Sequence, residues 1–150
     1  MARIEPLSPP YRSDLQVQFD AVMPPGVPPL ALFRTVAKSD RAWRKLRGGS
    51  LLDPGPLPLR EREIVIDRTC ALNDCAYEWG VHVAFFAEAA GLGPDEIAAT
   101  VHGDAASSCW GQADRALIAA VDALHHRARL GTAEFQRLNA YFDEAQIIEI

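Results

Sequence analysis

The sequence has few cysteines and no long apolar run. Both features restrict the classes of protein to which it can belong. Its cysteines, Cys70, Cys75 and Cys109, are odd in number and contain no Cys-x-x-Cys pair. They predict neither a disulfide framework nor a cysteine zinc site, and a reducing cytoplasm is the simplest compartment. No segment approaches the roughly 20 apolar residues of a membrane-spanning helix, and the N-terminus lacks the apolar stretch of a signal peptide. We therefore expect no membrane association.

Positive charge is also scarce. Fifteen Lys and Arg residues stand against 20 Asp and Glu residues, which gives a net charge of −5. The densest basic run, residues 41–47, fits a solvated helix face, and no cluster offers a surface that would neutralise a row of phosphates. We expect no nucleic-acid partner, whereas a small anionic substrate bound by a few local arginines is compatible with this composition.

Proline is almost absent from the last two thirds of the chain. Ten of the eleven prolines lie in residues 1–58, and only Pro94 follows them. Because proline fixes φ and interrupts helices, the first third should contain short helices at about 14–23, 30–38 and 40–47, the last capped by Asp40.

Longer helices are expected after this segment, because apolar residues recur there at steps of three and four. They should cover residues 58–72, 75–91, 94–101, 112–130 and 133–142, with stops at Gly91 and Gly131. No alternating strand pattern is present, so the predicted fold class is all-α. We expect one domain over residues 1–150, with an N-terminal extension at 1–27 and a helical core at 28–150.

The C-terminal segment looks like the beginning of one more helix. Asp143 followed by Gln146 forms a capping-box pattern, and isoleucines come directly after it. The sequence stops within two turns of that cap. We expect either that this last helix is truncated or that its isoleucines pack against another subunit.

The helix expected at 75–91 is apolar almost all round, yet it carries Cys75, Glu78 and His82. At about 100° per residue these three side chains share one face of the helix. A buried carboxylate needs a donor such as His82 or takes a raised pKa, because an unpaired charge away from water is costly. The cluster therefore predicts an acid and a base that work near neutral pH.

Each of these residues also has a structural interpretation. A Glu and a His four residues apart are commonly a surface pair, and a free cysteine is commonly a small core residue. Cys70 and Cys109 are expected to be such core thiols. Glu78 and His82 can supply two metal ligands, but no third or fourth is visible, so no metal is expected.

Residues 59–92 resemble the carboxymuconolactone decarboxylase and alkylhydroperoxidase D superfamily, and a weaker likeness covers residues 28–46 and extends to the chain end. The resemblance implies a helical bundle of the alkylhydroperoxidase D type, built around the helix pair at 58–91. It also implies a homo-oligomeric ring, a trimer or a hexamer, and one further helix after the point where this sequence stops.

The peroxidase branch of that superfamily is similar in its spacing Glu-x11-Cys-x-x-Cys-x-x-x-His, which aligns with Glu63, Cys75 and His82. Glu78 stands where the second cysteine belongs, so the disulfide of that pattern cannot form. Cys70 is not expected to replace it, because a predicted helix break separates it from Cys75.

The run Tyr77-Glu78-Trp79 followed by His82 is instead similar to the decarboxylase branch, whose members need no cofactor. The resemblance implies that His82 and Glu78 stabilise an oxyanion and deliver a proton, that Glu63 orients His82, and that Cys75 lines the pocket. The candidate substrate-binding residues are Arg34, Arg62, Arg68, Tyr77 and Trp79.

Three functions are therefore carried forward. The first is a cofactor-free proton-transfer enzyme of the decarboxylase type, acting on a small carboxylated or lactone substrate. The second is a peroxide-reducing or redox protein that uses Cys75 with an external thiol. The third is a non-catalytic oligomeric helical module in which Glu78 and His82 satisfy each other.

Overall fold

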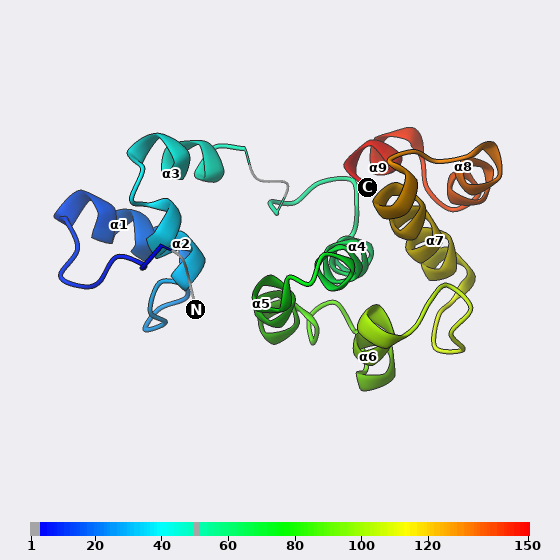
Figure 1. Ribbon diagram of the computed structural model, residues 1–150, viewed down its shortest axis with the longest axis horizontal. Helices are drawn as coiled ribbons and strands as arrows, with labels where there is room; N and C mark the ends of the chain where they lie inside the picture. The colour runs from blue at the N-terminus through cyan, green and yellow to red at the C-terminus, as the bar shows by residue number, and fades with distance from the viewer. Residues whose placement is uncertain (1–3, 50–51) are drawn as a thin grey trace. The chain divides into compact units, whose positions relative to one another are not determined.

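The computed structural model describes residues 4–49 and 52–150, and the regular structure of these residues is entirely helical. The all-α prediction is confirmed. The helices are α1 (Ser13–Val22), α2 (Ala31–Val36), α3 (Asp40–Arg47), α4 (Leu59–Leu72), α5 (Ala76–Phe86), α6 (Pro94–His102), α7 (Gln112–Arg127), α8 (Thr132–Asn139) and α9 (Glu144–Glu149) (Figure 1). In the described part of the chain no helix has the length and apolarity needed to cross a membrane.

The chain divides into two compact units, Met1–Asp53 and Pro54–Ile150. In the first unit, helices α1 to α3 share an aromatic core. Phe19 of α1 is fully buried and meets the ring of Trp43 of α3 edge-on at a centroid distance of 5.3 Å. Phe33 of α2 packs against the same tryptophan at 5.5 Å. The Trp43 indole N–H donates to Gln18, so the buried ring leaves no unpaired donor.

Apolar residues of segment 28–46 belong to the core of the first unit. Ala37 and Trp43 form their cluster with Leu15 and Phe19 of α1. The boundary between the units lies at residues 53 and 54, in the proline- and glycine-rich segment. The expected division into an extension at 1–27 and a core at 28–150 stays a prediction. That residues 1–150 act as one domain stays a prediction.

Helix α4 is the central element of the second unit. It packs against α5, α6 and α7, and α8 continues the core from α7 (Figure 1). The core side chains that are wholly removed from solvent are Ile64, Leu117, Ile118, Ala120 and Leu138. Burial of such side chains is the main stabilising contribution in a helical unit of this size.

Two arginines of α4 tie this helix to its neighbours. The Arg68 guanidinium donates to both carboxylate oxygens of Asp122 on α7, at 2.7 and 3.2 Å, and to the backbone carbonyls of Thr100 and Gly103. Bidentate pairs of this kind combine charge with a fixed geometry, so the contact sets the angle at which α4 and α7 pack.

The second arginine, Arg60, lies in the first turn of α4. It pairs with Glu96 of α6 and Asp114 of α7. Burial alone would raise the pKa of Glu96, but the hydrogen bond from Arg60 and the one from the Gly93 amide outweigh it and hold that pKa below its usual value. The three helices are thus joined by charge at the α4 N-terminus as well.

Some helix ends differ from the expected ones. Ser39 caps α3 by accepting a hydrogen bond from the Ala42 amide, and Asp40 is the first helical residue. Helix α7 ends at Arg127, because Ala128 takes the left-handed conformation with φ 52° that was expected at Gly131. The position of a left-handed residue thus depends on more than the presence of glycine.

The C-terminal capping box is confirmed. The Asp143 side chain accepts from the Gln146 amide, and the Gln146 side chain accepts from the Asp143 amide. Ile147 and Ile150 pack against the core of this same unit, whereas Ile148 is 83% exposed. Two of the three isoleucines therefore need no other subunit to cover them.

Candidate functional site

The turn between α4 and α5 sets the geometry of the candidate site. Asp74 adopts a left-handed conformation with φ 53°. Its amide donates to the Ala71 carbonyl, and the next amide, that of Cys75, donates to the Cys70 carbonyl at 2.9 Å. This pair of bonds is a Schellman motif, which satisfies the last carbonyls of α4 and lets α5 begin directly afterwards. The two helices then pack against each other.

This packing brings together three of the residues identified in the sequence. The His82 Nδ1 atom of α5 lies 2.7 Å from the Glu63 Oε2 atom of α4, and the Nε2 atom lies 3.6 Å from Oε1 of Glu78. Side-chain exposure is 1% for Glu63, 6% for His82 and 31% for Glu78. The three groups therefore form a row that leads from the interior of the unit to its surface.

The hydrogen bond with Glu63 fixes the state of the imidazole. A carboxylate can only accept, so Nδ1 carries a proton, and in the neutral ring Nε2 is left as the base. The distance of 3.6 Å between Nε2 and Glu78 is too long for a hydrogen bond. Such contacts are often loose before a substrate is bound and tighten afterwards.

Burial alone would lower the pKa of His82. The hydrogen bond to Glu63 and the negative charges of Glu63, Glu78 and Asp67 act in the opposite direction and outweigh burial, so the pKa is raised. The imidazole is thus held in a setting where its protonated form is favoured, as a proton donor near neutral pH requires.

Asp67 is a buried carboxyl that sequence reasoning did not single out. It is 1% exposed, and neither of its side-chain oxygens has a hydrogen-bond partner among the described residues. Burial and the nearby charge of Glu63 raise the pKa of Asp67 to about 7, against a smaller lowering by His82. The spacing of four residues from Glu63 was the available signal, because it places both carboxyls on one face of α4.

Helix α5 is apolar almost all round in sequence, but it is not buried on all sides. Its N-cap residue Cys75 is exposed, as are Tyr77 at 48% and Phe85 at 43%, and His82 is the buried residue of this helix. Helix α5 packs mainly along α4, so one side of it stays uncovered within this unit. Apolar composition alone did not reveal which sides of the helix have a partner.

A backbone hydrogen bond joins Cys70 to Cys75 across the turn between α4 and α5. The helix break was expected to separate them, but the Schellman motif turns the chain back, and the charges of Cys75, Glu78 and Asp67 all act on the Cys70 thiol. Burial, followed by these charges, raises the pKa of Cys70 to about 11.

The candidate substrate-binding residues fall in different surroundings. Arg62 lies at the site, where its guanidinium contacts Glu63 Oε1 at 3.1 Å and stacks over Phe86. Arg68 is directed to α6 and α7, as described above. The Trp79 indole donates to the Thr100 hydroxyl. Arg34 belongs to the other unit, where it donates to backbone carbonyls of Leu7 and Pro29.

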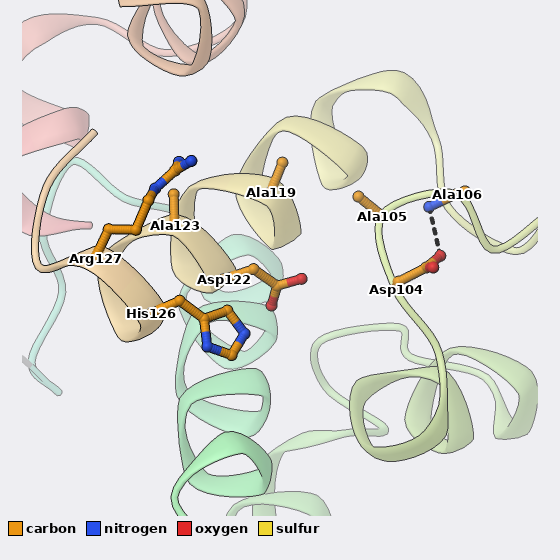
Figure 2. Close-up of a pocket in the computed structure, with 8 residues that line it drawn as sticks. All are labelled: Asp104, Ala105, Ala106, Ala119, Asp122, Ala123, His126 and Arg127. Carbon is orange, nitrogen blue, oxygen red and sulfur yellow. Dashed lines mark hydrogen bonds between the residues drawn. The ribbon is translucent and has the colours of Figure 1, made fainter. Parts of the chain in front are cut away.

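A cavity of 420 Å³ lies between α7 and the loop after α6, lined in part by residues with charged side chains (Figure 2). Asp122 and His126 of α7 and Asp104 of the loop border it, with Arg127 at the helix end. No sequence pattern indicated a cavity at this place. Asp122 is also the partner of Arg68, so part of its charge is already matched. Among residues 4–49 and 52–150, no three His, Cys, Asp or Glu side chains are grouped so as to hold a metal ion.

Comparison with known families agrees with this geometry. A family model described as carboxymuconolactone decarboxylase family matches residues 37–122. The chain belongs to this family. The matched region contains α4 and α5 whole, and hence the Glu63, His82 and Glu78 row, so the resemblance inferred from residues 59–92 is confirmed at the family level. No curated protein and no solved structure matches this member of the carboxymuconolactone decarboxylase family.

The raised pKa of Asp67 predicts a specific pH dependence of stability. The pKa of this carboxyl is about 7 in the folded state, and its ordinary value is 3.8. Between pH 3.8 and about pH 7, the folded protein therefore binds more protons than the unfolded chain does. The free energy of unfolding should therefore fall as the pH rises from 5 to 8. Asp67→Asn removes this titration and should lose less stability over the same range, measured by urea unfolding at each pH.

Asp95→Asn, at an exposed position in the first turn of α6, is the matched control and should leave the pH dependence of the wild type unchanged. Parallel profiles for Asp67→Asn and the wild type would show that Asp67 does not carry this proton.

Proposed function

We propose that this protein is a cofactor-free proton-transfer enzyme of the decarboxylase type, acting on a small carboxylated or lactone substrate. The observation that supports the proposal most is the row from buried Glu63 through His82 to partly exposed Glu78. Proton transfer to a bound molecule needs an acid and a base that are held in place and can be reached from outside. In this row Glu63 and His82 are buried, and Glu78 is exposed enough to meet a substrate.

The proposed reaction requires the site to stabilise an oxyanion and to supply a proton. When a carboxylated unsaturated lactone loses CO2, the remaining electron pair is delocalised onto the lactone carbonyl oxygen, and a carbon atom must then take a proton. His82 in its protonated form donates a hydrogen bond from Nε2 to the developing oxyanion, and Glu78 delivers the proton to carbon. Glu63 acts through His82 by fixing its tautomer and favouring its positive charge, so it is a positioning residue.

A substrate carboxylate would be met by Arg62. Of the three arginines named from the sequence, Arg62 is the one in contact with Glu63 beside the imidazole, and its guanidinium lies over the Phe86 ring. Tyr77, exposed on the first turn of α5, is proposed to line the same entrance. Arg68 and Trp79 are proposed only as supports of the helices that carry the site, because the Arg68 guanidinium and the Trp79 indole donate hydrogen bonds to groups of α6 and α7.

The uncovered side of α5 fits a homo-oligomer, a trimer or a hexamer, in which a second copy covers Tyr77 and Phe85. Large exposed apolar side chains on an element that carries a site commonly mark a contact surface. The free cysteines fit a reducing compartment, and in this proposal the protein is cytoplasmic.

A second candidate function is a thiol redox protein that uses Cys75. The exposure of this thiol at the start of α5 favours it, since a reactive cysteine must be reached by its substrate. Glu78 occupies the position of the second cysteine in the peroxidase pattern, which is why we place this function second.

The two functions predict opposite effects of substitution. His82→Gln and Glu78→Gln should each lower kcat/KM for a carboxylated unsaturated lactone by about 10²–10⁴-fold, because each removes a group that donates in the transition state. Turnover is measured as release of CO2, with the fold of each variant verified by circular dichroism.

Cys75→Ser is the control at the same site and should retain nearly all of this activity. Loss of activity in Cys75→Ser with retention in Glu78→Gln would favour the redox function. If all three variants turned over as the wild type does, the non-catalytic module would be the better account.

A further inference from the structure

Cys70 and Cys75 occupy two particular positions of the Schellman motif at the end of α4. In this motif the residue two places beyond the helix cap donates its amide to the carbonyl of a residue in the last helical turn, and their side chains frequently touch. Here the donor is Cys75 and the acceptor is Cys70, with the left-handed residue Asp74 between them. The motif therefore directs two free thiols to the same corner of the fold.

The electrostatic surroundings of Cys70 agree with this backbone geometry. The Cys70 side chain is half-buried, and the charges that act on it include those of Cys75, Glu78 and Asp67. Cys70 is thus within electrostatic reach of Cys75 and of two acidic groups next to His82.

We propose that Cys70 and Cys75 form a reversible disulfide across the α4–α5 turn, and that this pair is a thiol–disulfide exchange site for low-molecular-weight disulfides. The site lies beside the proposed proton-transfer row but does not depend on it. Four residues separate the two cysteines, whereas two separate them in the Cys-x-x-Cys pattern discussed above. The left-handed conformation of Asp74 permits a disulfide at the wider spacing, because it turns the chain back toward Cys70.

The two thiols differ in solvent exposure, and this difference indicates which of them reacts first. Cys75 is exposed and reacts first: its thiolate attacks one sulfur of a disulfide RSSR, forms the mixed disulfide Cys75–S–SR and releases one thiolate RS⁻. Cys70, which is half-buried with a pKa raised to about 11, then loses its proton and attacks the Cys75 sulfur, releasing the second RS⁻. In the whole reaction the two thiols are oxidised by two electrons, RSSR is reduced to two RSH, and two protons pass from the cysteines to the products.

The experiment is oxidation of the full chain with oxidised glutathione, followed by alkylation of free thiols, denaturation and cleavage before each aspartate. Such cleavage places Cys70 in peptide 67–73, Cys75 in peptide 74–94 and Cys109 in peptide 104–113, so mass spectrometry distinguishes every pairing. We expect a disulfide-linked pair of peptides 67–73 and 74–94, and an intact mass lower by two hydrogen atoms.

Three variants complete the test. Cys109→Ser, the matched control, should form the linked pair as the wild type does. Cys70→Ser should stop at the glutathione adduct on Cys75, and Cys75→Ser should give no linked peptide. The proposal is overturned if wild-type protein holds only the adduct after excess glutathione is removed, if Cys75 is linked to Cys109, or if the disulfide joins two chains.

Discussion

The hydrogen bond between the Glu63 carboxylate and the His82 imidazole is the interaction on which the rest of the site depends. It crosses from α4 to α5 at 2.7 Å, and both side chains are almost wholly removed from solvent. Because an unpaired charge in such a place is costly, neither residue is stable there without the other. Arg62 contacts the second oxygen of Glu63, so each oxygen of this carboxylate has a partner. The opposite nitrogen of the ring faces the partly exposed carboxylate of Glu78, at 3.6 Å.

Helix α4 serves two purposes on two faces, which explains why a central helix carries so many charged residues. Glu63 and Asp67 lie on the face that meets α5, where they make an acidic, partly unsatisfied environment. Ile64 lies in the apolar core with α7, and Arg68 joins the same helices by charge. The packed face gives rigidity to the face that carries the proposed chemistry, as a site with fixed distances requires.

The sequence indicated much of this arrangement, and the failures have physical causes. Periodic apolar positions located α4 and α6 closely. Helix spacing pointed to Glu78 and His82, the family resemblance added Glu63, and these three residues do lie together. Asp67 was within reach of the same reasoning, since it lies one turn from Glu63. The exposure of α5 could not be predicted, because apolar composition does not identify which neighbour covers a helix. The approach of Cys70 to Cys75 was also missed, because it depends on a left-handed aspartate where the sequence indicated only a helix break.

The state of the His82 imidazole tests the account most directly. A pH titration of its ring protons by NMR, assigned by their loss in His82→Gln, should give a pKa above the usual value of 6.5, and Glu63→Gln should lower it. A wild-type pKa at or below that value, unchanged in Glu63→Gln, would contradict the buried pair and the proton-transfer role built on it.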